Sequence, residues 1–214
     1  MSDPTNGNSP STLIRKATQN MSSSPLSLAV IIGSVRSGRF GSKVGTWFVE
    51  QAENRPDLKV DTIDLVDHEL PLTLPDWGEE PPEPARTVAA GLSNRLHAAD
   101  AFAVVTPEYN HSYPASLKNL VDWHRREWAA KPIGLISYGG MGGGIRASEH
   151  LRQVFAEMHA MTVRETLSFH NAWNDFNADT PPKDAEAAAT VLLDQLVWWA
   201  EALREARSSR PYHH

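Results

Sequence analysis

The sequence predicts an α/β fold in which one parallel sheet is covered by helices on both faces. Short apolar runs alternate along the chain with longer segments in which apolar residues recur every three or four positions. Several of the runs are apolar at nearly every position, which is typical of strands buried on both faces. The 214 residues suffice for one ordinary domain, and no internal repeat or linker divides them.

Five strands are predicted from these runs. The run at 28–32 is continuous and β-branched, whereas "KVDTIDLV" at 59–66 alternates between apolar and polar residues. "AFAVVT" at 101–106 and "PIGLIS" at 132–137 are again continuous, and a fifth strand is expected within 162–169. The alternation of these strands with helical segments indicates right-handed crossovers between parallel strands.

Helices are predicted between the strands and after the last one, because each intervening segment carries an apolar stripe at helical spacing. The long proline-rich segment 67–84 is expected to be a surface loop. The helices are expected at 40–54, at 85–99, in a short stretch after Pro114, at 145–160 and at about 183–206.

The two ends of the chain differ in composition from the predicted domain. Residues 1–25 are rich in Ser, Thr, Asn and Pro and lack an apolar run long enough for a secretory core or a membrane helix. We expect a disordered leader there, one domain over 26–207, and a flexible tail over 208–214.

The charge and the cysteine content exclude several classes of function. A net charge of −6 argues against a general nucleic-acid surface or an anionic-membrane surface. The chain has no cysteine, which excludes disulfides and thiolate metal sites and fits a cytoplasmic location. The histidines show no metal-ligand spacing, so no metal site is predicted. Ser137 lies outside any G-x-S-x-G motif, so a hydrolase is not predicted either.

Five strands in a domain of this size favour the flavodoxin-like strand order 2-1-3-4-5. In such sheets ligands bind outside the carboxyl ends of the strands, where the strand order reverses between strands 1 and 3. This rule selects the loops 33–40, 106–114 and 137–144, which also have the most unusual compositions in the chain.

The first of these loops, "GSVRSGRFG", joins the first strand to the first helix and has the features of an anion site. The N-terminus of a helix offers free N–H groups and the positive end of its dipole. Gly33, Gly38 and Gly41 permit close backbone approach, Ser34 adds a hydroxyl donor, and Arg36 can contact a phosphate with two hydrogen bonds. The alternative is a solvated turn. Neither the G-x-G-x-x-G dinucleotide motif nor the G-x-x-x-x-G-K-[ST] motif is present in this loop.

The other two loops are suited to a flat ligand. "TPEYNHSYP" combines two prolines with a tyrosine, and a stiff loop of this kind can turn its backbone groups toward the edge of a planar heterocycle. "SYGGMGGG" has few side chains, so a ring can lie against its backbone. The alternatives are a solvated charge or a structural partner for the lone Glu108, and a flexible lid for the glycine loop.

The three loops together resemble those of the NAD(P)H-dependent FMN reductase family, which includes quinone, azo-dye and chromate reductases. The resemblance covers about residues 26–180, and "PEYN…S.P..LKN..DW" is its most diagnostic part. It implies non-covalently bound FMN, hydride transfer from NADPH or NADH through the flavin to a small acceptor, and a homodimer or a dimer of dimers. Because FMN would carry the chemistry, no catalytic side chain is expected.

The same resemblance assigns the cofactor-binding residues. The phosphate would be held by Ser34, Arg36, Phe40, Gly41 and Ser42. The isoalloxazine ring would be lined by Pro107, Glu108, Tyr109 and Asn110 on one side and by Ser137, Tyr138, Gly139 and Gly140 on the other. Many family members have a serine where this chain has Arg39, so Arg39 either replaces that phosphate contact or points away.

The resemblance also leads to predictions about kinetics and assembly and leaves two other functions as alternatives. An open flavin face shared by both substrates predicts ping-pong kinetics. The tryptophan-bearing segment 113–128 is expected to lie between subunits, since a lone domain would expose it. The alternative functions are a flavodoxin-type electron carrier, against which Arg36 argues, and a flavin-based redox sensor.

Overall fold

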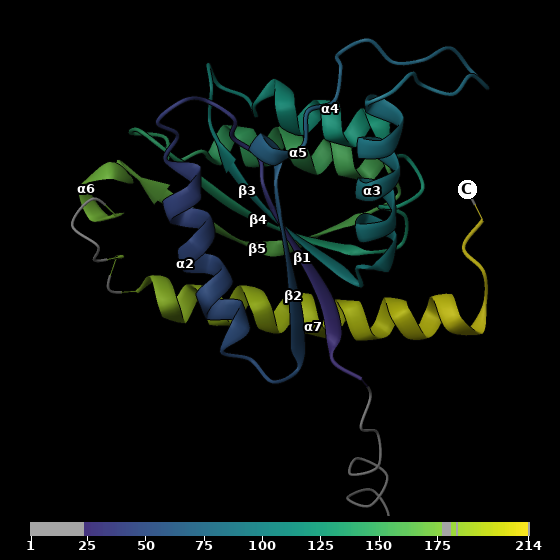
Figure 1. The fold of residues 1–214 in the computed structure, drawn as a ribbon. Coiled ribbons are helices and arrows are strands. Elements are labelled where there is room, and N and C mark those ends of the chain that lie inside the picture. The colour runs from purple at the N-terminus through teal and green to yellow at the C-terminus, as the bar shows by residue number, and fades with distance from the viewer. Residues whose placement is uncertain (1–23, 177–180, 183, 214) are drawn as a thin grey trace, which may run out of the picture.

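A computed structural model describes residues 24–176, 181–182 and 184–213, which form one five-stranded sheet with helices on both faces (Figure 1). All strand pairs are parallel and the order is β2-β1-β3-β4-β5, so the predicted fold class is confirmed. The strands are β1 (Leu26–Ile32), β2 (Leu58–Asp64), β3 (Ala101–Pro107), β4 (Pro132–Gly139) and β5 (Met161–His170).

The main helices agree with the predicted segments to within a few residues at each end. Their bounds are α2 (Gly41–Glu53), α3 (Ala85–Ala98), α4 (Ala115–Trp123), α5 (Ile145–Glu157) and α7 (Ala185–Ser209). Two short elements were not predicted, the 3₁₀ turn η1 (Leu65–Asp67) and α6 (Trp173–Phe176). Because α7 continues to Ser209, the first two residues of the expected tail are helical. The expected leader lies mostly outside the described residues.

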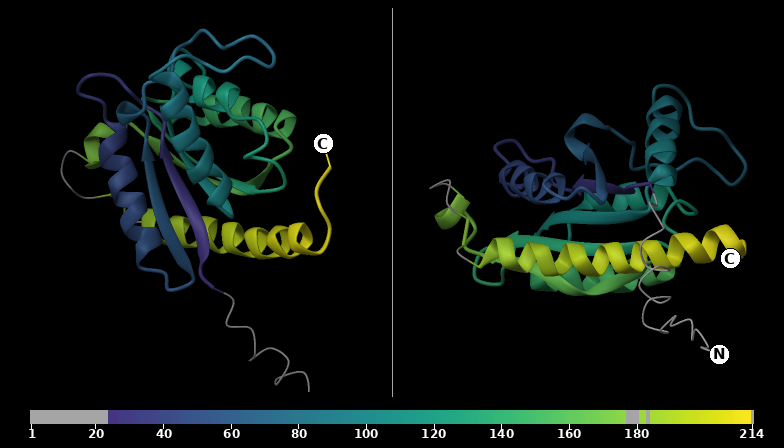
Figure 2. Two further views of the ribbon diagram at one scale, coloured as in Figure 1. Left: turned by 45° about the vertical axis from the view of Figure 1, so that its right-hand side comes forward. Right: turned by 90° about the horizontal axis from the view of Figure 1, so that it is seen from below.

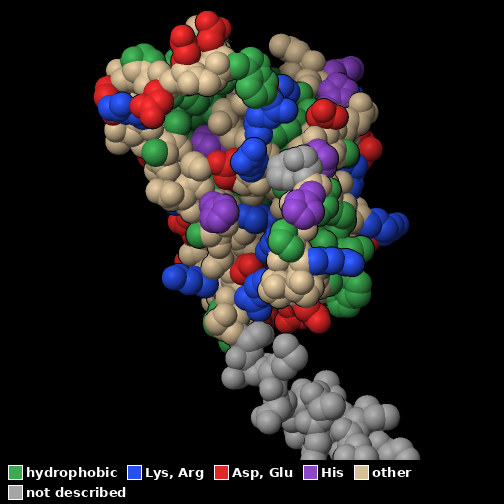
Figure 3. Space-filling view, turned by 90° about the vertical axis from the view of Figure 1, so that its right-hand side faces the viewer, with side chains coloured by type: hydrophobic (Ala, Val, Ile, Leu, Met, Phe, Trp, Pro, Cys, Tyr) green, Lys and Arg blue, Asp and Glu red, His purple; other side chains and the backbone are tan. Residues whose placement is uncertain are grey.

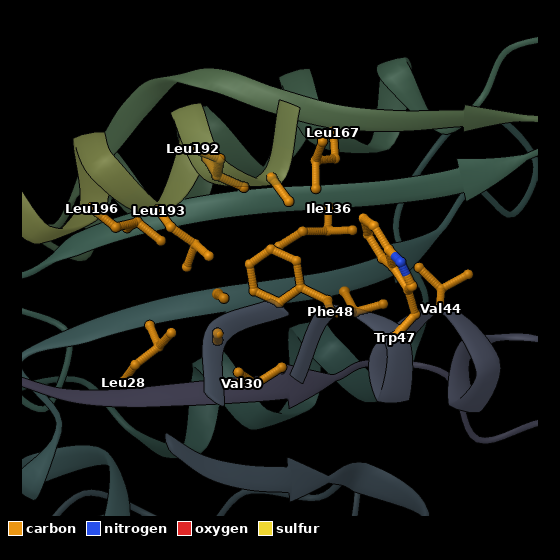
Figure 4. Close-up of a cluster of buried hydrophobic side chains, with 14 of the residues drawn as sticks. Leu28, Val30, Val44, Trp47, Phe48, Ile136, Leu167, Leu192, Leu193 and Leu196 are labelled. Atoms are coloured by element: carbon orange, nitrogen blue, oxygen red, sulfur yellow. The ribbon is translucent and has the colours of Figure 1, made fainter. Parts of the chain in front are cut away.

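The sheet separates two apolar clusters that alternate along each strand. Leu28 and Val30 of β1 pack with α2 and α7 on one face, in the cluster drawn in Figure 4. Ala29 and Ile31 pack with α3, α4 and α5 on the other face. Strands β1, β3 and β4 are buried at almost every position, as expected for central parallel strands.

Segment 113–128, which is predicted to lie between subunits, buries most of its apolar residues in the core of its own chain. Trp128 is fully buried, with its ring 4.7 Å from that of Phe102 and 5.5 Å from that of Phe155. The apolar residues of α4 are buried in the same cluster. Trp123 is only half-buried, and its indole N–H donates to the carbonyl of Pro71 at 2.9 Å. The segment therefore leaves no large apolar patch that needs a second subunit.

The loop between η1 and α3 projects away from the helices at one end of the molecule (Figures 1 and 2). At its start it is tied to α4, because the Asn119 amide donates to the carbonyl of Leu70 at 2.8 Å. Among the described residues, no helix combines the length and apolar character needed to cross a membrane. The described ranges also contain no cluster of His, Asp or Glu side chains that could hold a metal ion.

Candidate cofactor site at the carboxyl edge of the sheet

The three loops selected by the strand order line one pocket of about 350 Å³ at the carboxyl edge of the sheet. The loop that leaves β1 crosses to the start of α2, next to the ends of β3 and β4 (Figure 1). The volume lies within the usual range for pockets that bind small molecules. Its lining comprises Arg36, Ser37, Gly38, Arg39, Phe40, Pro107, Glu108, Tyr109, Tyr138, Gly139, Gly140 and Trp173.

Beneath this pocket, the first turn of α2 and two buried hydroxyl groups form a cradle, which we define as Ser34, Gly41 and Tyr138. The hydroxyl oxygens of Ser34 and Tyr138 are buried, and neither makes a regular hydrogen bond within the described residues. A Cβ placed on Gly41 would lie 2.5 Å from the Tyr138 oxygen and closer still to that of Ser34, so both hydroxyls flank this glycine. No side chain caps the helix, and its first turn has no acidic residue.

Unpartnered hydroxyls at a helix N-terminus are suited to an anion. Buried polar groups normally have a partner, because an unpaired one costs about 1–3 kcal/mol. Burial raises the pKa of Tyr138 to about 12, and the nearby Ser34 hydroxyl, which is too poorly placed for a regular hydrogen bond, lowers that pKa by less. Tyr138 therefore keeps its proton at neutral pH and can donate it. The site therefore offers hydroxyl donors and free helix N–H groups, and it is open because Gly41 has no side chain. A phosphate group fits such a site.

The two arginines of the first loop have different environments. The Arg36 guanidinium is exposed and lies over the Tyr109 ring, 5.4 Å from its centroid. Arg39 instead makes hydrogen bonds to both carboxylate oxygens of Asp64, at 2.8 and 2.5 Å, and to the carbonyl of Ser34 at 3.1 Å. The Arg39 and Asp64 side chains are only 14% and 19% exposed. Arg39 thus ties the loop to the end of β2, and only Arg36 presents an unpaired guanidinium to the pocket within the described residues.

The loop after β3 is held in a tight turn. The backbone groups of Tyr109 and Ser112 exchange hydrogen bonds of 2.8 and 3.1 Å, and Asn110 and His111 between them have positive φ angles of 50° and 70°. Such angles are uncommon outside glycine and cluster at functional sites. The turn therefore keeps Tyr109 in a fixed position at the pocket.

Glu108 anchors this loop to the start of α5. One carboxylate oxygen pairs with the Arg146 guanidinium at 2.8 Å, and the other accepts the Arg146 backbone N–H at 3.1 Å. A carboxylate at this position also complements the helix dipole. The side chain is 10% exposed, so Glu108 is a structural partner and not the solvated charge considered as an alternative.

The glycine-rich loop after β4 is packed against β5, which argues against the alternative of a flexible lid. The Ser137 hydroxyl donates to the carbonyls of Gly143, at 2.9 Å, and Leu167, at 3.3 Å, and the Ser168 hydroxyl also donates to Gly143. Gly144 has a φ of 86°, and a Cβ there would lie 2.6 Å from the Ser137 Cβ. Ser137 therefore fixes the loop from below.

The predicted cofactor residues thus fall into three groups. Nine of them line the pocket, namely Arg36, Arg39, Phe40, Pro107, Glu108, Tyr109, Tyr138, Gly139 and Gly140. Ser34 and Gly41 lie in the cradle beneath it. Asn110, Ser42 and Ser137 do not line it, and the Ser42 hydroxyl donates weakly to the carbonyl of Arg39 at 3.5 Å.

Ser37 and Trp173 line the pocket although neither was predicted as a site residue, and Gly38, predicted only to permit close backbone approach, lines it too. Ser37 and Gly38 belong to the selected first loop, whereas Trp173 begins the short helix α6 after β5. A Cβ on Gly140 would lie 3.4 Å from the Trp173 ring, so this tryptophan forms a wall beside the glycine loop. Trp173 follows shortly after the carboxyl end of β5, at the same edge of the sheet. This position in the sequence could have identified it as a candidate pocket residue.

Comparison with known proteins connects this geometry to a family. Residues 26–174, which include all three loops, match the model of the NADPH-dependent FMN reductase family. The chain belongs to this family. Membership confirms the family predicted from the loops, the oxidoreductase class of enzyme, and FMN with NADH or NADPH as the implied cofactors.

Individual relatives support the same assignment. The NAD(P)H-dependent FMN reductase C4B3.06c of Schizosaccharomyces pombe is 39% identical over 126 residues, which are 57% of this chain and 62% of that protein. The quinone reductase of Escherichia coli K12 is 35% identical over 67% of this chain and 76% of its own length.

A solved structure extends the similarity beyond these sequence matches. FerB from Paracoccus denitrificans, a flavoenzyme NAD(P)H:acceptor oxidoreductase, superimposes with a TM-score of 0.64 at 26% identity, covering 83% of this chain and 98% of FerB. The flavodoxin-like architecture is therefore shared along nearly the whole of that enzyme.

Proposed function

We propose that the pocket binds FMN with its phosphate in the cradle, and that the protein transfers electrons from NADPH or NADH to a small organic acceptor such as a flavin or a quinone. The observation that carries this proposal is the pair of buried, unpartnered hydroxyls of Ser34 and Tyr138 beside Gly41 at the start of α2. Bound FMN would supply the redox chemistry by accepting a hydride from the nicotinamide and passing two electrons to the acceptor.

The residues around the cradle would hold the phosphate at one end of the pocket. The Ser34 and Tyr138 hydroxyls and the first N–H groups of α2 would donate to its oxygens, and Arg36 would add charge-assisted hydrogen bonds from the solvent side. Arg39 would act indirectly, because its ion pair with Asp64 fixes the backbone that carries Ser34. This division of roles agrees with the exposure of Arg36 and the burial of Arg39.

The remaining walls suit a flat ring. Gly139 and Gly140 present backbone to the pocket, while Tyr109 and Trp173 border it with aromatic side chains. The tight turn after β3 and the packed loop after β4 keep these walls rigid, so ring position would be set before binding. We expect the nicotinamide and the acceptor to use the same open face of the ring in turn, which predicts ping-pong kinetics.

Spectroscopy on the purified protein tests the proposal. Protein incubated with FMN and freed of excess cofactor should retain a flavin absorbance spectrum, and anaerobic NADPH or NADH should bleach it at catalytic rates. A quinone added afterward should restore the colour. Retained flavin that neither nucleotide reduces would instead indicate an electron carrier or a redox sensor, and failure to retain FMN would refute the cofactor assignment.

Steady-state kinetics and light scattering test the finer statements. Parallel double-reciprocal lines are expected when NADPH and quinone are varied together, and intersecting lines would contradict a shared face. The family resemblance also predicts a homodimer or a dimer of dimers, and the absence of cysteine fits a cytoplasmic location. Light scattering at micromolar concentration tests the assembly, with a monomer as the contrary result.

A further inference from the structure

A second cavity lies at the opposite edge of the sheet from the cofactor pocket. It has a volume of about 350 Å³ and is enclosed by the segments that precede β4 and β5, the last turns of α7, and the residues that follow α7. It shares no lining residue with the cofactor pocket. We call it the amino-edge cavity.

The residues after α7 form part of its wall. The Tyr212 hydroxyl lies 3.1 Å from Nδ1 of His159, and the two rings meet edge to face with centroids 5.9 Å apart. Figure 1 shows the chain turning sharply away from the axis of α7 at the end of the helix. The opposite wall is fixed by two backbone hydrogen bonds, from the Ala130 N–H to the carbonyl of His159 at 2.8 Å and from the Met161 N–H to the carbonyl of Lys131 at 3.0 Å.

The lining of this cavity combines apolar surface with positive charge. Leu203, Met161 and Pro211 are among its apolar residues, and Arg207 and Arg210 also contribute to it. The described part of the lining contains no Asp or Glu, although the chain as a whole has a net charge of −6. Figure 3 shows the face of the molecule toward the C-terminus, where histidine, arginine and lysine side chains lie near the centre together with a few acidic ones.

The two arginines of the lining are bound differently. Arg207 donates to the carbonyl of Ala130 at 2.5 Å and to a carboxylate oxygen of Asp100 at 3.3 Å, so its position is fixed. Asp100 also accepts from Arg204 and from the backbone N–H of Ser27, which leaves its charge shared among several donors. Within the described residues, the Arg210 guanidinium makes no ion pair or hydrogen bond. An exposed, unpaired guanidinium at the mouth of an apolar cavity is suited to a carboxylate.

We propose that the amino-edge cavity binds a small monocarboxylate with an apolar body, of the chemical class of a medium-chain fatty acid. The carboxylate pairs with Arg210, near the fixed charge of Arg207, and the apolar chain lies against Leu203 and Met161. A mixed lining of this kind favours an amphipathic anion. A neutral apolar molecule would leave Arg210 unpaired, and a compact inorganic anion would leave the apolar walls exposed to water. The proposal is independent of the function of the cofactor pocket.

Calorimetric titration of the full-length, FMN-loaded protein with octanoate tests this site. Octanoate should bind with one-to-one stoichiometry and a Kd of about 1 mM or lower at low salt, and 1-octanol should bind at least about tenfold more weakly, because it lacks the charge. The Arg210→Gln variant should lose about tenfold in octanoate affinity, since one charge-assisted contact is removed. The matched control is Arg126→Gln, which removes the same charge from an exposed arginine outside the cavity.

A second variant guards against an indirect effect of the first. Ala206 lies in the lining on α7, so Ala206→Glu adds a carboxylate there without removing any arginine and should abolish octanoate binding. An unchanged melting temperature identifies folded variants. Absence of saturable binding to the parent protein, equal affinity for octanoate and octanol, or unchanged affinity in both folded variants would each overturn the proposal.

Discussion

Two glycines on the same fold provide a matched test of the phosphate cradle. A Cβ on Gly91 in α3 would meet no atom within 4 Å, whereas one on Gly41 would lie within 2.5 Å of the Tyr138 hydroxyl and would also collide with that of Ser34. Neither backbone has a positive φ angle, so alanine is conformationally allowed at both positions. Gly91→Ala should therefore stabilise the protein by roughly 0.5–1 kcal/mol through helix propensity.

Gly41→Ala should have the opposite effect, because overpacking of this kind costs about 1–3 kcal/mol. Its methyl group would also occupy the space proposed for phosphate oxygens. Losing two charge-assisted hydrogen bonds, each worth roughly 1.5–3 kcal/mol, predicts at least about a 100-fold loss in FMN affinity. Flavin fluorescence titrations and urea denaturation of both variants measure these effects. A Gly41→Ala protein that folds and binds FMN as tightly as the parent would refute the cradle.

Three further predictions follow from other contacts. Arg39→Ala should lower the free energy of unfolding in urea by about 1–3 kcal/mol, because it leaves the half-buried Asp64 unpaired. Combining Arg39→Met with Asp64→Leu should recover part of this loss. An Arg39→Ala variant as stable as the parent would contradict the assigned ion pair. Trp173→Ala should weaken FMN and riboflavin alike by about tenfold, since this residue borders the pocket and not the cradle, and a loss confined to FMN would argue against that role. Burial, followed by the charge of Arg207, lowers the pKa of Lys131 from 10.5 to about 8. Between pH 8 and 10.5 the unfolded chain therefore binds more protons than the folded protein, and its free energy of unfolding should rise with pH. From pH 7.5 to 9.5 the parent should gain about 2 kcal/mol relative to Lys131→Met. A free-energy difference between the two proteins that stays constant with pH would contradict the lowered pKa of Lys131.

The general position of the site followed from the sequence because it depends on topology. Buried parallel strands joined by helices limit the strand order to few choices, and the order fixes which loops meet at the carboxyl edge. The assignment of individual side chains needed more than loop membership. Arg36 and Arg39 are three residues apart in one irregular loop, and no periodicity separates a free guanidinium from a paired one. Their difference arises because Ile32 and Asp64 are paired in register at the ends of β1 and β2.

The alternation of side chains along β4 could have corrected one assignment. Ile136 and Tyr138 face the cluster formed with α2 and α7, whereas Ile133 and Leu135 face the other cluster. Ser137 therefore points away from the side on which Tyr138 lies, as the period of two in a strand requires. No comparable signal was available for Trp128. Burial in the core and burial between subunits both require apolar side chains. Trp128 lies in an irregular segment, which has no helical or strand periodicity to show which of the two kinds of burial applies.

The most direct test of the account compares FMN with riboflavin on the Arg36→Ala variant. Riboflavin has the same ring but no phosphate, so a contact to the phosphate affects only FMN. Arg36 is exposed and outside the core, so its removal should leave the fold intact. Equilibrium titrations should show FMN affinity reduced by about one to two orders of magnitude, with a weaker salt dependence, while riboflavin affinity stays unchanged. An FMN affinity equal to that of the parent, or an equal loss for both ligands, would contradict the proposal that this loop binds the phosphate.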